Sequence, residues 1–159
     1  GAVYACDLSQ DIGDLTDTQQ RAACVQLLDV GFLTVGPNGH FSGVSVGDNK
    51  NWIFIGLESE TENDDFNQAV GAWETYKQEI IAVNVVTLAK RRLAHHRSRA
   101  CDTYGHQPRV SCSPTGNKVL WVSNMNDSTP AGYSDVYGIE NPLGAVASVS
   151  LGSSLGGLG

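Results

Sequence analysis

The stretch NDDFNQAVGAWETYKQEIIAVNVVTLAKRRLAHHRSR, residues 63–99, decides the fold of this chain. Asn63 or Asp64 can cap the start of a helix, and basic residues collect at the end, where they suit the helix dipole. Apolar residues recur every three or four positions, the period of one face of an α-helix. The pattern therefore predicts a long helix that reaches about Arg99. Its apolar face would carry Phe66, Val70, Trp73, Tyr76, Ile80 and Val83.

Two features of this stretch argue against one straight helix. About 35 helical residues would extend on the order of 50 Å at 1.5 Å per residue, which exceeds the width of a domain of this size. The β-branched residues around Val85 and Val86 also disfavour a helix. We therefore expect a bend or a break, and a strand from Ile81 to Leu88 is the competing prediction.

The sequence before this stretch predicts a strand, a helix and then further strands. Thr16 and Gln19 have the spacing of a capping box, and Gly31 can end the helix in the left-handed conformation. Residues 3–8 predict a strand before it. Asn38-Gly39 is typical of a hairpin turn, here between predicted strands at 32–35 and 40–46.

The remaining strands are predicted at residues 52–57 and in a hairpin of residues 109–112 and 118–123. The order strand, helix, strand, strand, helix, strand is that of a split βαβ, ferredoxin-like arrangement. We therefore predict an α+β fold, a two-layer sandwich with two helices on one face of an antiparallel sheet. Residues 1–140 would form a single domain, and the Gly/Ser-rich residues 141–159 a C-terminal tail.

The chain has four cysteines, an even number without C-x-x-C or Cys/His metal spacing. This pattern indicates two disulfides and a secreted, extracellular protein. Four cysteines allow three pairings. The predicted topology favours Cys6 with Cys112, across neighbouring strands, and Cys24 with Cys101, between the two helices. A glycosylation sequon begins at Asn126.

The net charge of −7 argues against nucleic acid as a partner. Five of the ten Lys and Arg residues nevertheless fall in one short run. We consider four interpretations of this run: a solvated helix end, a processing site at the dibasic pair, a docking patch for an anionic membrane or polyanion, and a pH sensor. The run contains Lys90, Arg91, Arg92, His95, His96, Arg97 and Arg99.

The sequence predicts no metal site, no cofactor and no defined catalytic residue. Adjacent histidines on a helix point about 100° apart and chelate poorly, so surface positions are expected for His95 and His96. A secreted ribonuclease needs a general base, a general acid and a cation beside the phosphate. His40, Glu58, His106 and Arg109 are of the required types, but their spacing does not select them.

The short strand with its early cysteine, Tyr4-Ala5-Cys6, the predicted helices over an antiparallel sheet and the dibasic Lys90-Arg91 resemble small secreted fungal proteins. These are the killer toxins and the pathogen effectors, linked to virulence, that share an α/β-sandwich architecture. The resemblance is one of layout over about residues 3–123. It implies a non-enzymatic protein that acts on a host or competitor cell, at its membrane or a surface receptor.

Three function classes follow as hypotheses. The first is a secreted toxin-like or effector protein that binds a component of a host or competitor cell. The second is a small secreted enzyme, most plausibly a ribonuclease-like hydrolase. The third is a structural protein that self-assembles through residues 141–159. The sequence does not specify the oligomeric state.

Overall fold

A computed structural model describes residues 2–7, 9, 13–29, 38–58, 75–98, 107–125 and 134–144, without the side chains of residues 38 and 58. This part of the chain contains nine strands and one short helix. The elements are β1 Ala2–Ala5, α1 Asp17–Ala23, β2 Val25–Asp29, β3 Asn38–Gly43, β4 Trp52–Glu58, β5 Glu79–Asn84, β6 Lys90–His95, β7 Ser111–Cys112, β8 Lys118–Ser123 and β9 Asp135–Glu140.

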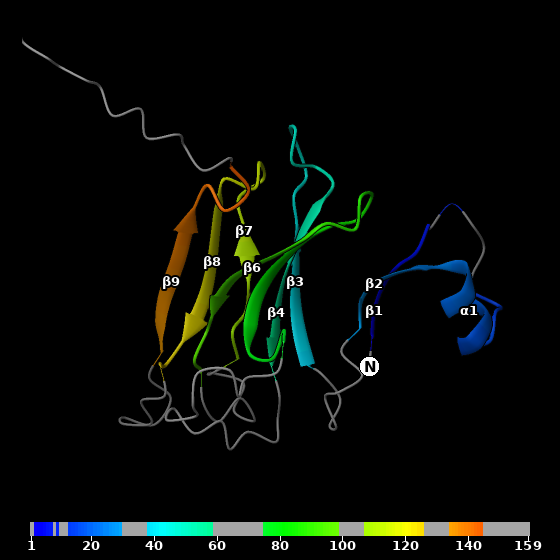
Figure 1. The fold of residues 1–159 in the computed structure, drawn as a ribbon, viewed down its shortest axis with the longest axis horizontal. Coiled ribbons are helices and arrows are strands. Elements are labelled where there is room, and N and C mark those ends of the chain that lie inside the picture. The colour runs from blue at the N-terminus through cyan, green and yellow to red at the C-terminus, as the bar shows by residue number, and fades with distance from the viewer. Residues whose placement is uncertain are drawn as a thin grey trace, which may run out of the picture.

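The described strands form three antiparallel sheets. A four-stranded sheet has the order β3-β4-β5-β6, and the two other sheets are the pair β1-β2 and the triplet β7-β8-β9. Figure 1 shows the four-stranded sheet between them, with β1, β2 and α1 at one side and β7 to β9 at the other. The predicted two-layer α+β fold is therefore wrong, and the protein is mostly β.

Strand β5 explains why the helix prediction failed. Its residues pair with β4 and β6, and both of its faces are covered. Ile81 and Val83 belong to the core beneath β1-β2, whereas Ile80 and Ala82 belong to the core beneath β7-β8-β9. A strand buried on both faces is apolar at successive positions, so it lacks the alternation that marks a half-buried strand. Residues 79–84 and 90–95 are strands, and residues 59–74 lie outside the described part.

Strand β4 shows the same division between the two cores. Ile55 and Leu57 face the first core, and Phe54 faces the second. All three side chains are buried. The central sheet thus supplies the common wall of two hydrophobic cores, and each outer sheet closes one of them.

Helix α1 begins as predicted but ends early. The Thr16 side chain accepts from the backbone of Gln19, and the Gln19 side chain bonds the Thr16 backbone, which confirms the capping box. The helix stops at Ala23 instead of continuing toward Gly31. Residues 25–29 form β2, because Leu27 and Leu28 are buried against the central sheet while β2 pairs with β1.

The predictions for the remaining strands gave mixed results. The strand at 52–57 and the hairpin of 109–112 and 118–123 are confirmed by β4, β7 and β8. The turn at Asn38-Gly39 is wrong, because both residues lie in β3, opposite Glu58 and Leu57. In the stretch assigned to a tail, Leu143 is buried in the second core, and residues 145–159 lie outside the described part.

The disulfide pairing differs from the prediction. Cys6 is bonded to Cys24, with their Cα atoms 4.4 Å apart, so neither Cys6–Cys112 nor Cys24–Cys101 forms. Cys112 is a half-buried free thiol, and Cys101 lies outside the described residues. The predicted pairing assumed two adjacent helices and neighbouring first and last strands, and the described part of the chain shows neither arrangement.

Candidate functional site

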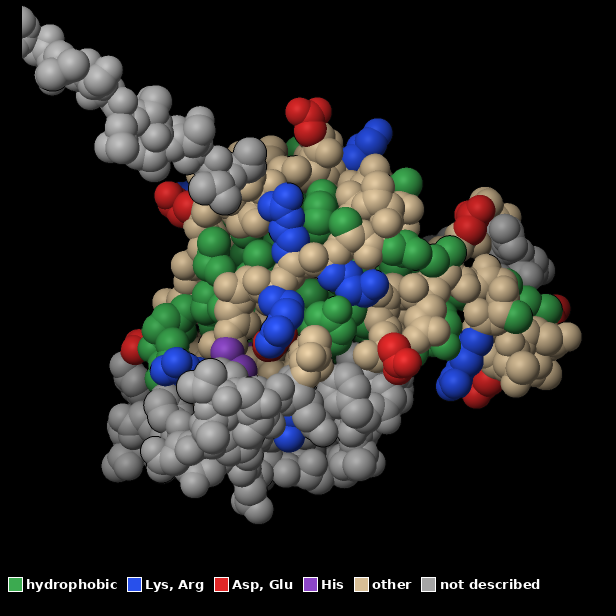
Figure 2. Space-filling model, in the orientation of Figure 1, with side chains coloured by type: hydrophobic (Ala, Val, Ile, Leu, Met, Phe, Trp, Pro, Cys, Tyr) green, Lys and Arg blue, Asp and Glu red, His purple; other side chains and the backbone are tan. Residues whose placement is uncertain are grey.

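The basic run lies on an edge strand and is not the end of a helix. Strand β6 forms one edge of the central sheet, and Lys90, Arg91 and Arg92 are exposed along it. We call these three residues the β6 cation cluster. Figure 2 shows Lys and Arg side chains over the middle of one face of the molecule, above β5 and β6, with hydrophobic side chains between them. Charged side chains on an edge strand also discourage pairing with another chain.

The members of the β6 cation cluster point to two faces of the sheet. Lys90 lies opposite Val83 and Arg92 opposite Ile81, on the face covered by β1-β2. Arg91 lies opposite Ala82, on the face covered by β7-β8-β9. The cations therefore line both sides of the edge and do not form one flat patch.

Arg92 forms an ion pair with Glu79 within the protein. Its guanidinium donates from Nε to both carboxylate oxygens of Glu79, at 2.9 and 2.7 Å, and Nη2 also contacts the carboxylate. Glu79 is buried, so this pairing supplies its compensating charge. The hydrogen bond to Glu79 raises the pKa of Arg92. Arg92 therefore has a structural role, and Lys90 and Arg91 are the members with more freedom to contact a partner.

Arg91 is held on an aromatic surface. Its Cζ lies 5.4 Å from the centre of the Trp52 ring, a distance at which the cation is attracted to the ring face. The Lys90 ammonium donates to the carbonyl oxygen of Leu88 at 3.4 Å. Both cations remain exposed. Arg91 is aligned by a contact with β4, and Lys90 by a contact within the β5–β6 hairpin.

The two histidines of the run are not surface residues as expected. His96 is fully buried, and its Nε2 lies 2.9 Å from the carbonyl oxygen of Leu57. The Ser98 backbone N–H donates to His96 Nδ1, so Nε2 carries the proton and donates to Leu57. His95 is half-buried and stacks on His96. The His96 ring joins the segment after β6 to the end of β4. The ring nitrogens of His95 are buried, so neither histidine is part of an exposed docking patch.

The last two cations of the run are Arg97 and Arg99, and the structure describes the first of them. Arg97 is exposed and has a positive φ of 55°, at the point where the chain leaves β6. Arg99 lies outside the described residues. Within the described part, the accessible portion of the predicted patch is therefore Lys90, Arg91 and Arg97, with Arg92 beside them.

The disulfide changes the processing hypothesis for Lys90-Arg91. Both Cys6 and Cys24 precede this pair in the chain, and Cys112 is a free thiol. The Cys6–Cys24 bond would therefore not hold the two products of a cut after Arg91 together. Cys112 packs instead against β3, where the Ser42 hydroxyl accepts from the Cys112 backbone N–H at 3.0 Å.

The ribonuclease candidates are only partly brought together. His40 on β3 bonds the side chain of Gln107 at 3.2 Å, and the Gln107 carbonyl accepts from the Arg109 backbone N–H. His40 and Arg109 thus lie on adjoining segments. His106 and the side chain of Glu58 lie outside the described residues, as does the sequon at Asn126.

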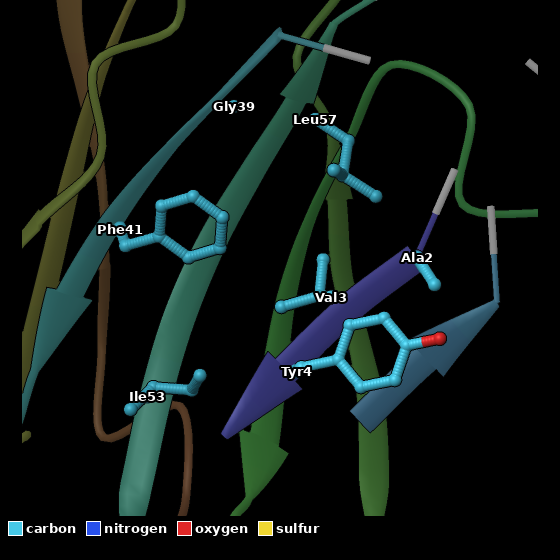
Figure 3. Close-up of a pocket in the computed structure, with 7 residues that line it drawn as sticks. All are labelled: Ala2, Val3, Tyr4, Gly39, Phe41, Ile53 and Leu57. Carbon is cyan, nitrogen blue, oxygen red and sulfur yellow. The ribbon is translucent and has the colours of Figure 1, made fainter. Parts of the chain in front are cut away.

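An apolar pocket of about 370 Å³ opens between the two-stranded sheet and the central sheet. Its wall carries side chains of β1, β3 and β4, as Figure 3 shows. Phe41 of β3 is more than half exposed there, because the β1-β2 pair covers β4 and β5 and leaves the β3 part of this face open. The lining residues are Ala2, Val3, Tyr4, Gly39, Phe41, Ile53 and Leu57. This lining offers one phenol and no other ionisable side chain, so it can hold an apolar group but supplies no acid–base pair.

The turn between β5 and β6 is a further feature, which the sequence did not indicate as a site. It exposes Val86 and Leu88 next to the β6 cation cluster. The helix prediction placed both residues within a continuous helix. One sequence signal does indicate a turn here. Asn84 lies between two apolar runs, and asparagine favours the start of a turn.

The described residues contain no group of three or more His, Cys, Asp or Glu side chains that could hold a metal ion. No helix in this part of the chain has the length and apolar character needed to cross a bilayer. The chain matches no protein-family model, no curated protein and no solved structure.

Proposed function

We propose that this chain is an extracellular binding protein that acts without catalysis, by attaching to a component of a host or competitor cell through strand β6. The observation that carries the proposal is the exposure of Lys90 and Arg91 on an edge strand of a protein with a net charge of −7. An isolated cationic surface on an acidic protein selects an anionic partner and discourages contacts elsewhere.

The Cys6–Cys24 disulfide supports the extracellular compartment, because disulfides persist chiefly in oxidising environments. The toxin-like or effector role and the target on another cell are part of this proposal. They rest on the resemblance in layout. The early cysteine and the dibasic pair still support that resemblance, whereas the predicted helical layer no longer does.

Binding of the labelled protein to intact yeast, plant and animal cells tests the proposal. We expect saturable binding to at least one cell type at micromolar concentration and a loss of about tenfold or more in the double variant Lys90→Glu, Arg91→Glu. Arg21→Glu, Lys118→Glu is the matched control, because it reverses the same number of exposed cations, on α1 and β8, away from β6. Absence of binding to every cell type, or equal losses in both variants, contradicts the proposal.

The adjoining positions of His40 and Arg109 support a second candidate, a ribonuclease-like activity. The base would be His40, held by Gln107, and Arg109 would face the phosphate. Incubation with single-stranded RNA tests this candidate. Cleavage that disappears in both His40→Ala and Arg109→Ala would establish it in place of the binding function, and intact RNA would eliminate it.

A further inference from the structure

We propose that the turn between β5 and β6 docks this protein onto an anionic lipid bilayer. Residues 85–89 form this turn, which we call the hairpin tip. Val86 and Leu88 would enter the headgroup region, while Lys90 and Arg91 would contact the lipid phosphates. The inference rests on the proposed function and names the anionic partner as a lipid surface.

The hairpin tip is closed by hydrogen bonds from a single residue. The Asn84 side-chain oxygen accepts from the backbone N–H groups of Val86 and Thr87, at 3.0 and 2.9 Å. The Asn84 carbonyl accepts from Leu88, and the Asn84 N–H donates to the carbonyl of Ala89. Val85, the first residue of the tip, packs against the first core. The conformation of residues 86–88 is defined by these hydrogen bonds and does not require burial of Val86 or Leu88.

The side chains that this turn presents are unfavourable in water. Val86 is 67% exposed and Leu88 is 38% exposed. Leu88 also has a φ of 60°, a conformation that glycine or asparagine adopts far more readily than leucine. A turn with this geometry has no structural need for two apolar side chains, and strain of this kind points to a functional constraint.

Cations follow the apolar residues at once. The Lys90 ammonium reaches back to the carbonyl of Leu88, and Arg91 comes next on β6. The neighbouring β3–β4 loop adds to the same region, because Val85 N–H donates to the carbonyl of Asn51 at 2.8 Å. That loop brings Lys50, which precedes Asn51, and one acid, Asp48.

The order of these groups along the hairpin matches the layers of a membrane. Apolar side chains at the end of the hairpin suit the boundary of the acyl chains, and the cations two and three residues after Leu88 suit the phosphate layer. A soluble polyanion would engage Lys90 and Arg91 but leave Val86 and Leu88 in water. An anionic bilayer accommodates all four residues in one contact.

Sedimentation with phosphatidylcholine vesicles, with and without phosphatidylserine, tests the inference. We expect binding to require phosphatidylserine and to weaken about tenfold in Val86→Ser, Leu88→Asn, because less apolar surface enters the interface. Asn tolerates the positive φ of position 88, so this variant keeps the turn. Lys90→Ser, Arg91→Ser should lose about fivefold for each cation and most of the dependence on phosphatidylserine.

A matched control removes the same side chains elsewhere. Val136 is 67% exposed on β9 and Leu120 is 47% exposed on β8, so Val136→Ser, Leu120→Asn changes exposed apolar surface without touching the hairpin tip. Circular dichroism checks that all variants are folded. Equal binding to both vesicle types, or equal losses in the tip and control variants, overturns the inference.

The cell-binding assay separates this inference from the proposed function. Cell binding that requires Lys90 and Arg91, without binding to phosphatidylserine vesicles, would reject the lipid and leave a different anionic target. Absence of binding in both assays would reject both proposals. Binding to both, with loss in the tip variant, supports both.

Discussion

The two outer sheets are attached to the central sheet in different ways. The three-stranded sheet shares a core with it and is also joined by polar contacts, which connect His40 with Gln107, Ser42 with Cys112, and Val46 with Pro114. In the described part of the chain, the β1-β2 pair packs on the central sheet through the apolar side chains of the first core, and the disulfide lies within the N-terminal segment itself. The comparison indicates that directional contacts help to fix the three-stranded layer, whereas apolar burial holds the β1-β2 pair.

The largest effects should come from adjacent core residues that face opposite layers. Phe54→Ala should lower the free energy of unfolding by about 3–5 kcal/mol and Ile55→Ala by about 2–5 kcal/mol, because each leaves a cavity. Hydrogen exchange should show that Phe54→Ala loosens β8 and that Ile55→Ala loosens β1 and β2. Identical patterns of lost protection would show that the two cores are not distinct.

Removing the disulfide should affect one layer selectively. The bond closes a loop between residues 18 positions apart, and Cys6→Ser, Cys24→Ser should cost about 3 kcal/mol. Hydrogen exchange should accelerate in β1, α1 and β2 first, since the bond links the ends of β1 and α1 within this layer. Cys112→Ser changes a free thiol and is the control. Equal acceleration throughout the central sheet would contradict the comparison.

A smaller loss of stability is expected from a substitution at Gly56, where β4 lies close to the Pro108 carbonyl oxygen on the side of the three-stranded sheet. A Cβ added at Gly56 would lie 2.6 Å from the Pro108 carbonyl oxygen, whereas one added at Gly43 would meet only Ile53, at 3.9 Å. Gly56→Ala should therefore cost about 1–3 kcal/mol by overpacking, while Gly43→Ala should be neutral or slightly stabilising. Urea denaturation measures both, and equal stabilities would refute the close contact.

The smallest effect is expected at the hairpin tip, away from both layers. Leu88→Asn should leave the free energy of unfolding unchanged or raise it by up to about 1 kcal/mol, because the substituted residue tolerates a positive φ. Thermal unfolding measures the change. A clear loss of stability would mean that Leu88 packs within the fold, and would remove the strain argument for its role at a membrane.

Local signals were reliable where neighbouring residues alone decide the structure. The Thr16–Gln19 capping box, the strand at 52–57 and the β7–β8 hairpin were predicted from sequence and are confirmed. The basic run was also found, although its setting on an edge strand was not. The local preference of these residues agrees with the tertiary contacts that they make, whereas at Asn38-Gly39 the pairing of β3 with β4 overrides the local turn signal.

The wrong predictions share a different cause. Ile80 and Ile81 are both buried, against different layers, so β5 shows no period of two and its spacing matches a helix. Leu27 and Leu28 are also adjacent and both buried, in this case in the same core, so β2 likewise shows no period of two. Once β5 was taken as a helix, the neighbours of each cysteine changed, and the predicted pairing of Cys24 followed from that error.

The sequence by itself determined the start of α1, several strands, the excess of acidic groups and the concentration of cations in residues 90–99. These depend on composition and on short-range hydrogen bonding. Only the tertiary structure decided that β5 is covered on both faces, that Cys6 meets Cys24 and that His96 is buried. Each of these depends on which distant segments become neighbours. The apolar character of a residue indicates that it will be buried, but not which segment will pack against it.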